Sequence, residues 1–118
     1  MNILERQLAN RVTEADFMAW VIDVAHLYGW RVMHSRPARR ADGSWRTAIA
    51  GDVGFPDCVF AHPIRGLFLV AELKSQKGRV TLEQGVWLEA LQVAGVRAEV
   101  WRPASRDYVL KLLSGTKP

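Results

Sequence analysis

Apolar residues recur at helical spacing in the first third of the chain. Thr13 can cap a helix, with Asp16 at the third helical position, and the apolar repeat that follows ends at Gly29. The residues expected to face the core from this helix are Phe17, Trp20, Val21, Val24 and Tyr28. Residues 1–12 predict a weaker amphipathic helix or turn that uses Ile3, Leu4 and Leu8.

Short apolar runs predict strands in the middle of the chain. Residues 58–61 and 67–71 flank a His-Pro-Ile-Arg-Gly break, and this arrangement is typical of a β-hairpin. Both faces of this hairpin are apolar, so we expect helices to cover both. Residues 30–35 predict an earlier strand, and residues 96–101 predict a later one.

A second helix is predicted over residues 81–94. Thr81 and Gln84 have the spacing of a capping box, and Gly95 ends the helix. Its inward stripe consists of Val86 or Trp87, with Leu88 and Leu91. A short helix carrying Tyr108, Val109 and Leu112 follows the last strand, and the tail 114–118 is expected to fray. The fold class is therefore α/β, with a central mixed β-sheet flanked by helices in the order α-β-β-β-α-β.

Residues 36–54 are polar and small, which predicts a hairpin-like loop or flap with a strand near 45–49. Several arginines lie here beside Trp45, and two more basic residues follow the central hairpin. Arginine forks match phosphate geometry, so we expect these side chains to position DNA without reading its sequence. The alternative is a solvated loop. The DNA-binding candidates are Arg36, Arg39, Arg40, Arg46, Lys77 and Arg79.

Size and composition indicate one folded domain over residues 1–118. The chain is 49% hydrophobic and 24% charged, with a net charge of +4 that favours a polyanionic partner. Its one cysteine, Cys58, lies in a predicted buried strand and cannot form an internal disulfide. We find no membrane span and no signal peptide, so we expect a cytoplasmic protein without a membrane partner.

The central hairpin also brings charged residues together. A hairpin symmetric about Ile64 and Arg65 places Asp57 opposite Glu72, and strand alternation puts Lys74 on the same face. Two neighbouring carboxylates in apolar surroundings require a compensating cation, and Mg²⁺ or Mn²⁺ favours such oxygen ligands. A metal and a lysine together stabilise charge on a reacting phosphate. The competing interpretation is a surface salt bridge at a strand end.

Pro56-Asp57, fourteen intervening residues and Glu72-Leu73-Lys74 form a pattern that resembles the PD-(D/E)XK nuclease signature. Gly54 before this pattern and Thr81-Leu82-Glu83-Gln84 after it narrow the resemblance to stand-alone VRR-NUC domains similar to Holliday-junction resolvases. The resemblance covers about residues 13–102 and implies a restriction-endonuclease-like core. It also implies a homodimer acting on branched DNA.

The resemblance assigns roles to particular residues. Asp57, Glu72 and the backbone carbonyl of Leu73 would bind Mg²⁺ or Mn²⁺, with Glu14 reaching the metal directly or through water. Lys74 would orient or deprotonate the attacking water, and Gln84 would help to arrange the site. The expected activity is metal-dependent DNA endonuclease cleavage, structure-specific on substrates such as four-way junctions. For Glu14 and Gln84 the alternatives are a favourable helix-dipole charge and a pure capping role.

Two other functions fit the same sequence. One is a catalytically inactive DNA-binding or assembly module of the same fold. The other is a small α/β domain that binds RNA and whose charged cluster is a structural ion pair. The intact set of Asp57, Glu72 and Lys74 favours the enzyme over both.

Overall fold

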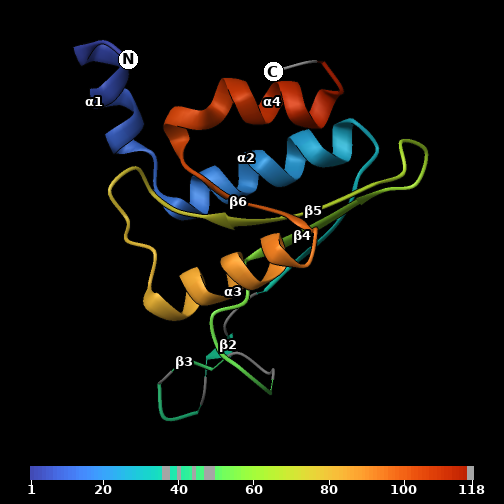
Figure 1. Cartoon of the computed structure of the whole chain (residues 1–118). Coiled ribbons are helices and arrows are strands. Elements are labelled where there is room, and N and C mark those ends of the chain that lie inside the picture. Colours follow the sequence, from blue (N-terminus) through green and yellow to red (C-terminus); the bar gives the residue numbers. More distant parts are fainter. Residues whose placement is uncertain (36–37, 40, 44, 47–49, 117–118) are drawn as a thin grey trace.

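The computed structural model describes residues 1–35, 38–39, 41–43, 45–46 and 50–116, with backbone alone at 38, 39, 45 and 46. These residues form a mixed α/β fold with four α-helices and a four-stranded mixed sheet (Figure 1). The helices are α1 (Ile3–Arg11), α2 (Glu14–Leu27), α3 (Leu82–Val93) and α4 (Arg106–Ser114), the last preceded by the short 3-10 turn η1 (Pro103–Ser105).

The main sheet has the strand order β1-β4-β5-β6. Its strands are β1 (Arg31–His34), β4 (Cys58–His62), β5 (Leu67–Leu73) and β6 (Arg97–Trp101). The first three are antiparallel neighbours, whereas β5 and β6 are parallel and joined through α3. A separate small hairpin, β2 (Ala38–Arg39) with β3 (Trp45–Arg46), extends from the body of the molecule (Figure 1). The expected α-β-β-β-α-β order is therefore present, with β2 and β3 inserted after its first strand.

The register of the central hairpin is as predicted. Cys58 pairs with Ala71 and His62 pairs with Leu67, which is the pairing of a hairpin symmetric about Ile64 and Arg65. The same register places Asp57, just before β4, across from Glu72. Because side chains alternate along a strand, Glu72 lies on the same face of β5 as Val70.

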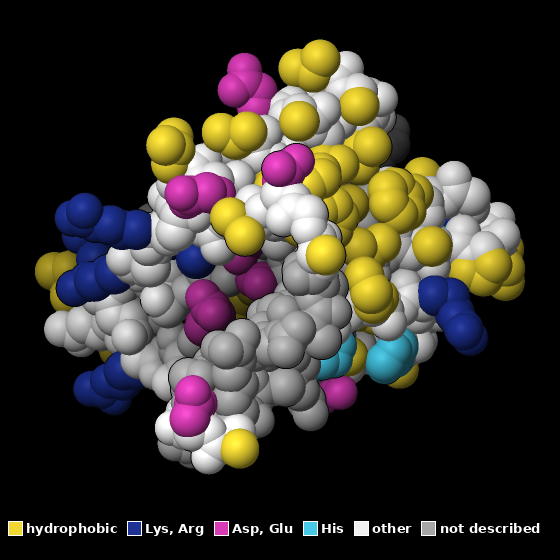
Figure 2. Space-filling model, turned by 90° about the horizontal axis from the view of Figure 1, so that it is seen from below, with side chains coloured by type: hydrophobic (Ala, Val, Ile, Leu, Met, Phe, Trp, Pro, Cys, Tyr) yellow, Lys and Arg dark blue, Asp and Glu magenta, His cyan; other side chains and the backbone are white. Residues whose placement is uncertain are grey.

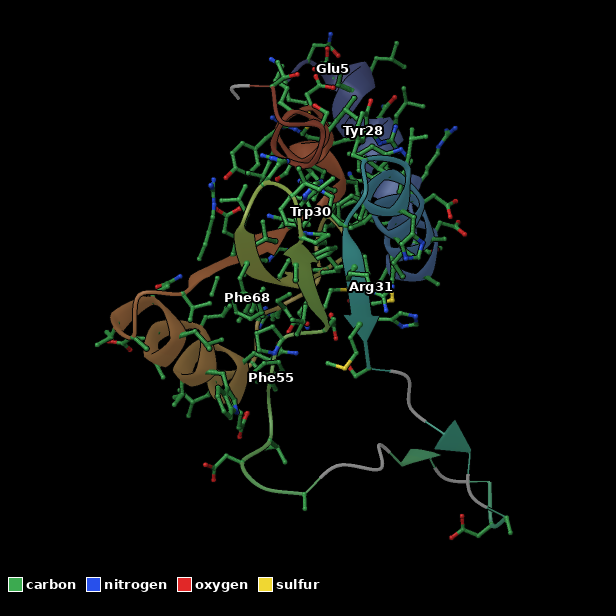
Figure 3. The ribbon with its side chains drawn as sticks, turned by 90° about the vertical axis from the view of Figure 1, so that its right-hand side faces the viewer. Glu5, Tyr28, Trp30, Arg31, Phe55 and Phe68 are labelled. Atoms are coloured by element: carbon green, nitrogen blue, oxygen red, sulfur yellow. The ribbon has the colours of Figure 1, made fainter. Side chains whose placement is uncertain are left out.

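The sheet is packed on both faces (Figures 1 and 3). Helices α2 and α4 cover one face, where Phe17, Phe60 and Trp101 are fully or almost fully buried. Helix α3 covers the other through Leu88, which packs near Val70 and Ala98. The core extends beyond residue 102, because Val109 and Leu113 of α4 are completely buried. Figure 3 shows Trp30 on the α2 and α4 side and Phe55 beside α3.

The caps follow the sequence closely. The Thr13 hydroxyl accepts a hydrogen bond from the Asp16 amide at 3.0 Å, and Thr81 with Gln84 forms a complete capping box. Gly29 and Gly95 both have φ of +87°, as left-handed residues after a helix do. In the described chain no helix is long and apolar enough to cross a membrane.

Two expected core positions, Tyr28 and Phe68, differ from the prediction, and the choice between Val86 and Trp87 is decided. Tyr28 is 39% exposed, because α2 already ends at Leu27 and Ala25 takes the buried position. Val86 is 60% exposed, and Trp87 is the member of that pair that packs inward, edge to face against Phe55. Phe68 is 52% exposed, since the hairpin projects past the covering helices near its turn.

Candidate active site

The charged cluster lies where β4 begins and β5 ends. Glu72 is 1% exposed although it carries an ionisable carboxyl group. Its Oε1 lies 4.0 Å from the Lys74 ammonium. Its Oε2 is buried and has no hydrogen-bond partner in the described part of the chain. A buried carboxyl oxygen left in this state is costly, so the cluster is not an ordinary surface salt bridge.

Asp57 sits beside this carboxyl group and is anchored to the sheet. Its Oδ2 accepts a hydrogen bond from the Leu73 amide at 3.1 Å, which fixes the aspartate against the end of β5. The main chain is held on the other side too, because the Ser35 amide donates to the Asp57 carbonyl at 3.0 Å. Leu73, whose carbonyl was a predicted metal ligand, has a fully buried side chain.

The electrostatics of the three carboxyl groups are linked. Burial raises the pKa of Glu72 to about 9, together with the hydrogen bond that its protonated carboxyl group donates to Asp57 and the negative charge of Asp57, while Lys74 opposes the shift. The pKa of Glu14 is raised as well, by burial and then by the Asp57 charge. Glu14 thus interacts electrostatically with both Asp57 and Lys74, although it belongs to α2 and lies 43 positions before Asp57 in the chain.

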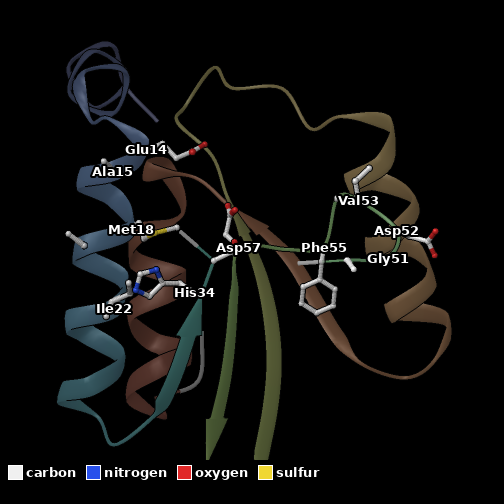
Figure 4. Close-up of a pocket in the computed structure, with 14 residues that line it drawn as sticks. Glu14, Ala15, Met18, Ile22, His34, Gly51, Asp52, Val53, Phe55 and Asp57 are labelled. Carbon is white, nitrogen blue, oxygen red and sulfur yellow. The ribbon is translucent and has the colours of Figure 1, made fainter. Parts of the chain in front are cut away.

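Glu14 and Asp57 line one pocket of about 750 Å³ (Figure 4). In the close-up, the Glu14 side chain projects from the start of α2 across the mouth of the pocket where Asp57 stands. His34 and Ser35 line it from the end of β1, and residues 50–55 form the opposite wall. The space-filling view shows acidic side chains in a hollow of this side of the molecule, with Lys and Arg side chains gathered along one edge (Figure 2).

Lys74 is held by its neighbours on β6 and in the following turn. Its amide donates to the Trp101 carbonyl at 3.0 Å, continuing the parallel pairing. Arg102 Nη1 donates to the carbonyls of Ser75 and Gly78 at 2.8 and 2.6 Å, closing the turn after the lysine. Lys77 and Arg79, two of the predicted DNA-binding residues, are exposed on this turn and its continuation.

Gly54 brings the site against α3. Its φ is +98°, and a Cβ at this position would lie 2.6 Å from the Glu83 carbonyl carbon and 2.8 Å from the Gln84 amide nitrogen. Only glycine fits so close to the backbone. Gln84 itself uses its side-chain oxygen to accept from the Thr81 amide at 2.9 Å, which is the capping role. Its predicted supporting role in the site stays a prediction.

The predicted arginines are only partly described. Arg36 and Arg40 lie outside the described residues. Arg39 and Arg46 are in β2 and β3, where the structure gives their backbone only. Their expected contact with DNA therefore remains a sequence-based prediction. Cys58, next to the site, is buried, and burial followed by the charges of Asp57 and Glu72 raises its thiol pKa to about 12, so the thiol stays protonated and unreactive.

The donor set fits a divalent cation on chemical grounds. Glu72 Oε2, which has no partner among the described residues, and the adjacent Asp57 offer oxygen ligands, which Mg²⁺ and Mn²⁺ prefer, and a cation would offset their mutual repulsion. Within the described ranges, no group of three or more His, Cys, Asp and Glu side chains is arranged to hold a metal. Any such ion would therefore bind to few protein side chains, a coordination common for Mg²⁺, which keeps several waters.

Several residues of the pocket were not identified from the sequence. His34 has a buried Nδ1 without a hydrogen-bond partner in the described chain, and Met18, Ile22 and Phe55 line the same space. A second apolar strip on α2, at positions 15, 18, 19 and 22, was the available signal. Nothing in the sequence indicated Arg102.

Comparisons with known proteins add no assignment: no family model, no curated protein and no solved structure matches this chain.

Proposed function

We propose that this protein is a divalent-metal-dependent DNA endonuclease of the PD-(D/E)XK type, similar to stand-alone VRR-NUC domains, with a restriction-endonuclease-like core. One observation carries the proposal. The Glu72 carboxyl is buried at 1% exposure, next to Asp57 and Lys74, and one of its oxygens has no hydrogen-bond partner among the described residues. A buried carboxyl group beside a lysine and a pocket-lining, half-buried aspartate is costly for folding and useful for phosphate chemistry.

Each residue has a definite task in this proposal. Asp57 and Glu72, with the Leu73 carbonyl, hold Mg²⁺ or Mn²⁺, and Glu14 approaches from α2 directly or through water. A bound ion of this kind supplies Lewis-acid stabilisation and a more acidic water. The Lys74 ammonium orients or deprotonates the attacking water and offsets negative charge on the reacting phosphate. The Arg102 contacts keep the turn next to Lys74 in place.

Basic residues beside the carboxylates serve the DNA backbone. Lys77 and Arg79 are exposed directly after the Lys74 strand end, and the whole chain carries a net charge of +4. Phosphate contacts of this kind position a duplex without selecting its sequence. We therefore propose that the protein recognises DNA shape, with branched DNA such as four-way junctions as substrate. A homodimer would supply the paired active sites that such a junction requires.

A cleavage assay with Mg²⁺ or Mn²⁺ tests the proposal on a four-way junction, a flap, a linear duplex and a single strand. The Lys74→Ala protein and a chelator reaction are the controls. Symmetric metal-dependent junction cuts that the variant lacks would support the proposal in full. Cleavage of every substrate would keep the nuclease and remove the junction preference. Metal-independent binding without cleavage would instead favour an inactive DNA-binding module.

A further inference from the structure

Beside its core-facing positions, helix α2 has a second apolar strip, of which only Met18 also packs against the main core. The fully buried positions of α2, which face the core, are Phe17, Val21 and Ala25. The pocket is lined instead by Ala15, Met18, Ala19 and Ile22, which share another face of the helix because of their three- and four-residue spacing. Ala15 and Ala19 are exposed and Met18 and Ile22 half-buried, so this strip remains uncovered in the described chain.

The wall opposite this strip is firmly attached to α3. Trp87 Nε1 donates to the Asp52 carbonyl at 3.1 Å, and the Trp87 ring meets Phe55 edge to face at 5.0 Å. Gly54 is pressed against the first turn of α3. One wall of the pocket is therefore α2 itself, and the other is the segment 50–55, which is held by α3 on the opposite face of the sheet. These contacts form the pocket before any ligand binds.

The two ends of the pocket differ in chemistry. Glu14 and Asp57 bring carboxyl groups to the pocket near the start of α2, Ile22 and His34 lie together further along the helix, and Met18 lies between the two pairs (Figure 4). The His34 Nδ1 atom is inaccessible, so the pocket meets the other atoms of its ring. A volume of about 750 Å³ lies within the range of pockets that enclose a small organic ligand.

We propose that the apolar end of this pocket binds an unstacked nucleobase, from a nucleotide adjacent to the phosphate held at the acidic end. The inference rests on the proposed nuclease function and names the feature of the substrate that the site selects. A nucleotide joins an anionic phosphate to a flat, largely apolar ring with polar edges, and the pocket has matching ends. Side-chain rings and apolar walls accept a base of any sequence through its face.

A fully paired duplex cannot fill this pocket without losing base stacking. Unstacking costs a few kcal/mol in a regular helix and least where a base is already unpaired. Branch points, flaps and mismatches provide such bases. Selection for branched DNA then follows from one pocket in each chain.

The test uses a substitution that fills the pocket and a fluorescent base that reports unstacking. Ala19→Phe adds a ring to the exposed strip of α2, and Ala94→Phe adds the same ring to an exposed alanine at the end of α3 that does not line this pocket. Both should fold, since neither alanine is buried. Binding is measured with Ca²⁺, which permits binding with little cleavage, on branched DNA carrying 2-aminopurine at nucleotides flanking the mapped cut. The fluorescence of this base rises when it leaves the stack.

For the wild type and Ala94→Phe we expect a fluorescence rise at one flanking nucleotide. For Ala19→Phe we expect that rise to disappear and affinity to fall roughly ten- to a hundredfold, as for loss of one base-stacking contact. Replacing that base by an abasic residue should weaken binding of the wild type and leave Ala19→Phe unchanged. Unaltered fluorescence at every flanking position, or equal affinities for the two Phe variants, would overturn the inference.

The two proposals fail in different ways. If the wild type cuts DNA in a metal- and Lys74-dependent manner but leaves the probe stacked, the nuclease stands and the base pocket is wrong. If the wild type cuts none of the substrates, the proposed function itself is wrong, whatever the fluorescence shows.

Discussion

The central hairpin has a buried polar group at each end. The two groups differ in whether their hydrogen-bonding atoms have partners. Near the turn, His62 is 8% exposed and its ring is fully used: Nδ1 accepts from the amides of Ile64 and Arg65, and Nε2 lies 2.8 Å from the Tyr28 carbonyl. At the other end, Glu72 is 1% exposed and one oxygen has no partner among the described residues.

The difference separates a structural polar group from a functional one. A buried group kept for stability usually has all its hydrogen bonds, because each missing bond costs free energy. His62 is of this kind, and it holds the turn to the end of α2. The Glu72 oxygen without a described partner is better explained by a ligand that binds it during function. The proposed divalent ion is such a ligand.

The largest effect should come from removing a charge at the Glu72 end. Asp57→Asn keeps an oxygen that can accept from the Leu73 amide, so the fold should be retained. It removes a negative ligand, and we expect cleavage to fall about a thousandfold or more. Single-turnover cleavage and thermal melting measure the two properties. Asp23→Asn, at an exposed position of α2, is the matched control. Cleavage at the wild-type rate by Asp57→Asn would remove this residue from the site.

The wall behind the site should be the next most sensitive. Gly54→Ala combines a φ of +98° with a contact of 2.6 Å to the backbone of α3. Gly51→Ala has a similar φ of +105°, but its Cβ would meet no described residue within 4 Å. We expect Gly54→Ala to cost about 2–4 kcal/mol of unfolding free energy and Gly51→Ala about 1–2 kcal/mol. Urea denaturation measures both. Equal losses would mean that the close approach to α3 contributes nothing.

At the turn end of the hairpin, a substitution should change stability and leave the cleavage activity unchanged. His62→Ala removes the acceptor of two amides and a contact to Tyr28, for which we expect a loss of about 1–3 kcal/mol. The rate of cleavage per folded molecule should stay at the wild-type value, because His62 is at the far end of the hairpin from Glu72. His26→Ala, at an exposed position, controls for the loss of an imidazole. A His62→Ala protein that is stable but inactive would reverse the assignment of the two ends.

The sequence predicted the frame of the molecule better than the contents of the pocket. The symmetric turn of the hairpin determined its register, and through it the meeting of Asp57 and Glu72. Local signals also determined the Thr81–Gln84 capping box and the glycine ends of the helices. These features depend on neighbours in the chain, so a pattern reveals them.

The remaining features depend on contacts between distant segments. The Arg102 contact with the turn after Lys74 joins two loops brought together by parallel pairing of β5 and β6. His34 lines the pocket because β1 runs back along α2, which places this histidine beside Ile22. The choice of Trp87 over Val86 was decided by Phe55, more than thirty positions earlier. No spacing rule within one segment encodes such meetings.

The smallest expected effect is a change in stability caused by a substitution of Glu72. This substitution should stabilise the protein, whereas His62→Ala at the turn should destabilise it. Glu72→Gln replaces an acid whose pKa is raised to about 9 by burial and Asp57. The folded protein holds a proton that the unfolded chain releases, so wild-type stability should decline as pH rises from about 5 towards 9. Gln does not titrate. With a chelator present we therefore expect the variant to melt a few degrees above wild type at pH 8, with the gap closing towards pH 5.

Glu99→Gln is the matched control for this comparison. Burial alone would raise the pKa of Glu99, but hydrogen bonds from Trp101, Arg97 and Tyr108 lower it below the usual value. Its carboxylate is thus stabilised as a charge, and Glu99→Gln should lower the melting temperature at pH 8. Adding Mn²⁺ should raise the melting temperature of the wild type and leave Glu72→Gln nearly unchanged, because only the former has the anionic ligand. A constant gap between Glu72→Gln and wild type from pH 5 to 9 would show that Glu72 is satisfied without a cation, as His62 is without any ligand.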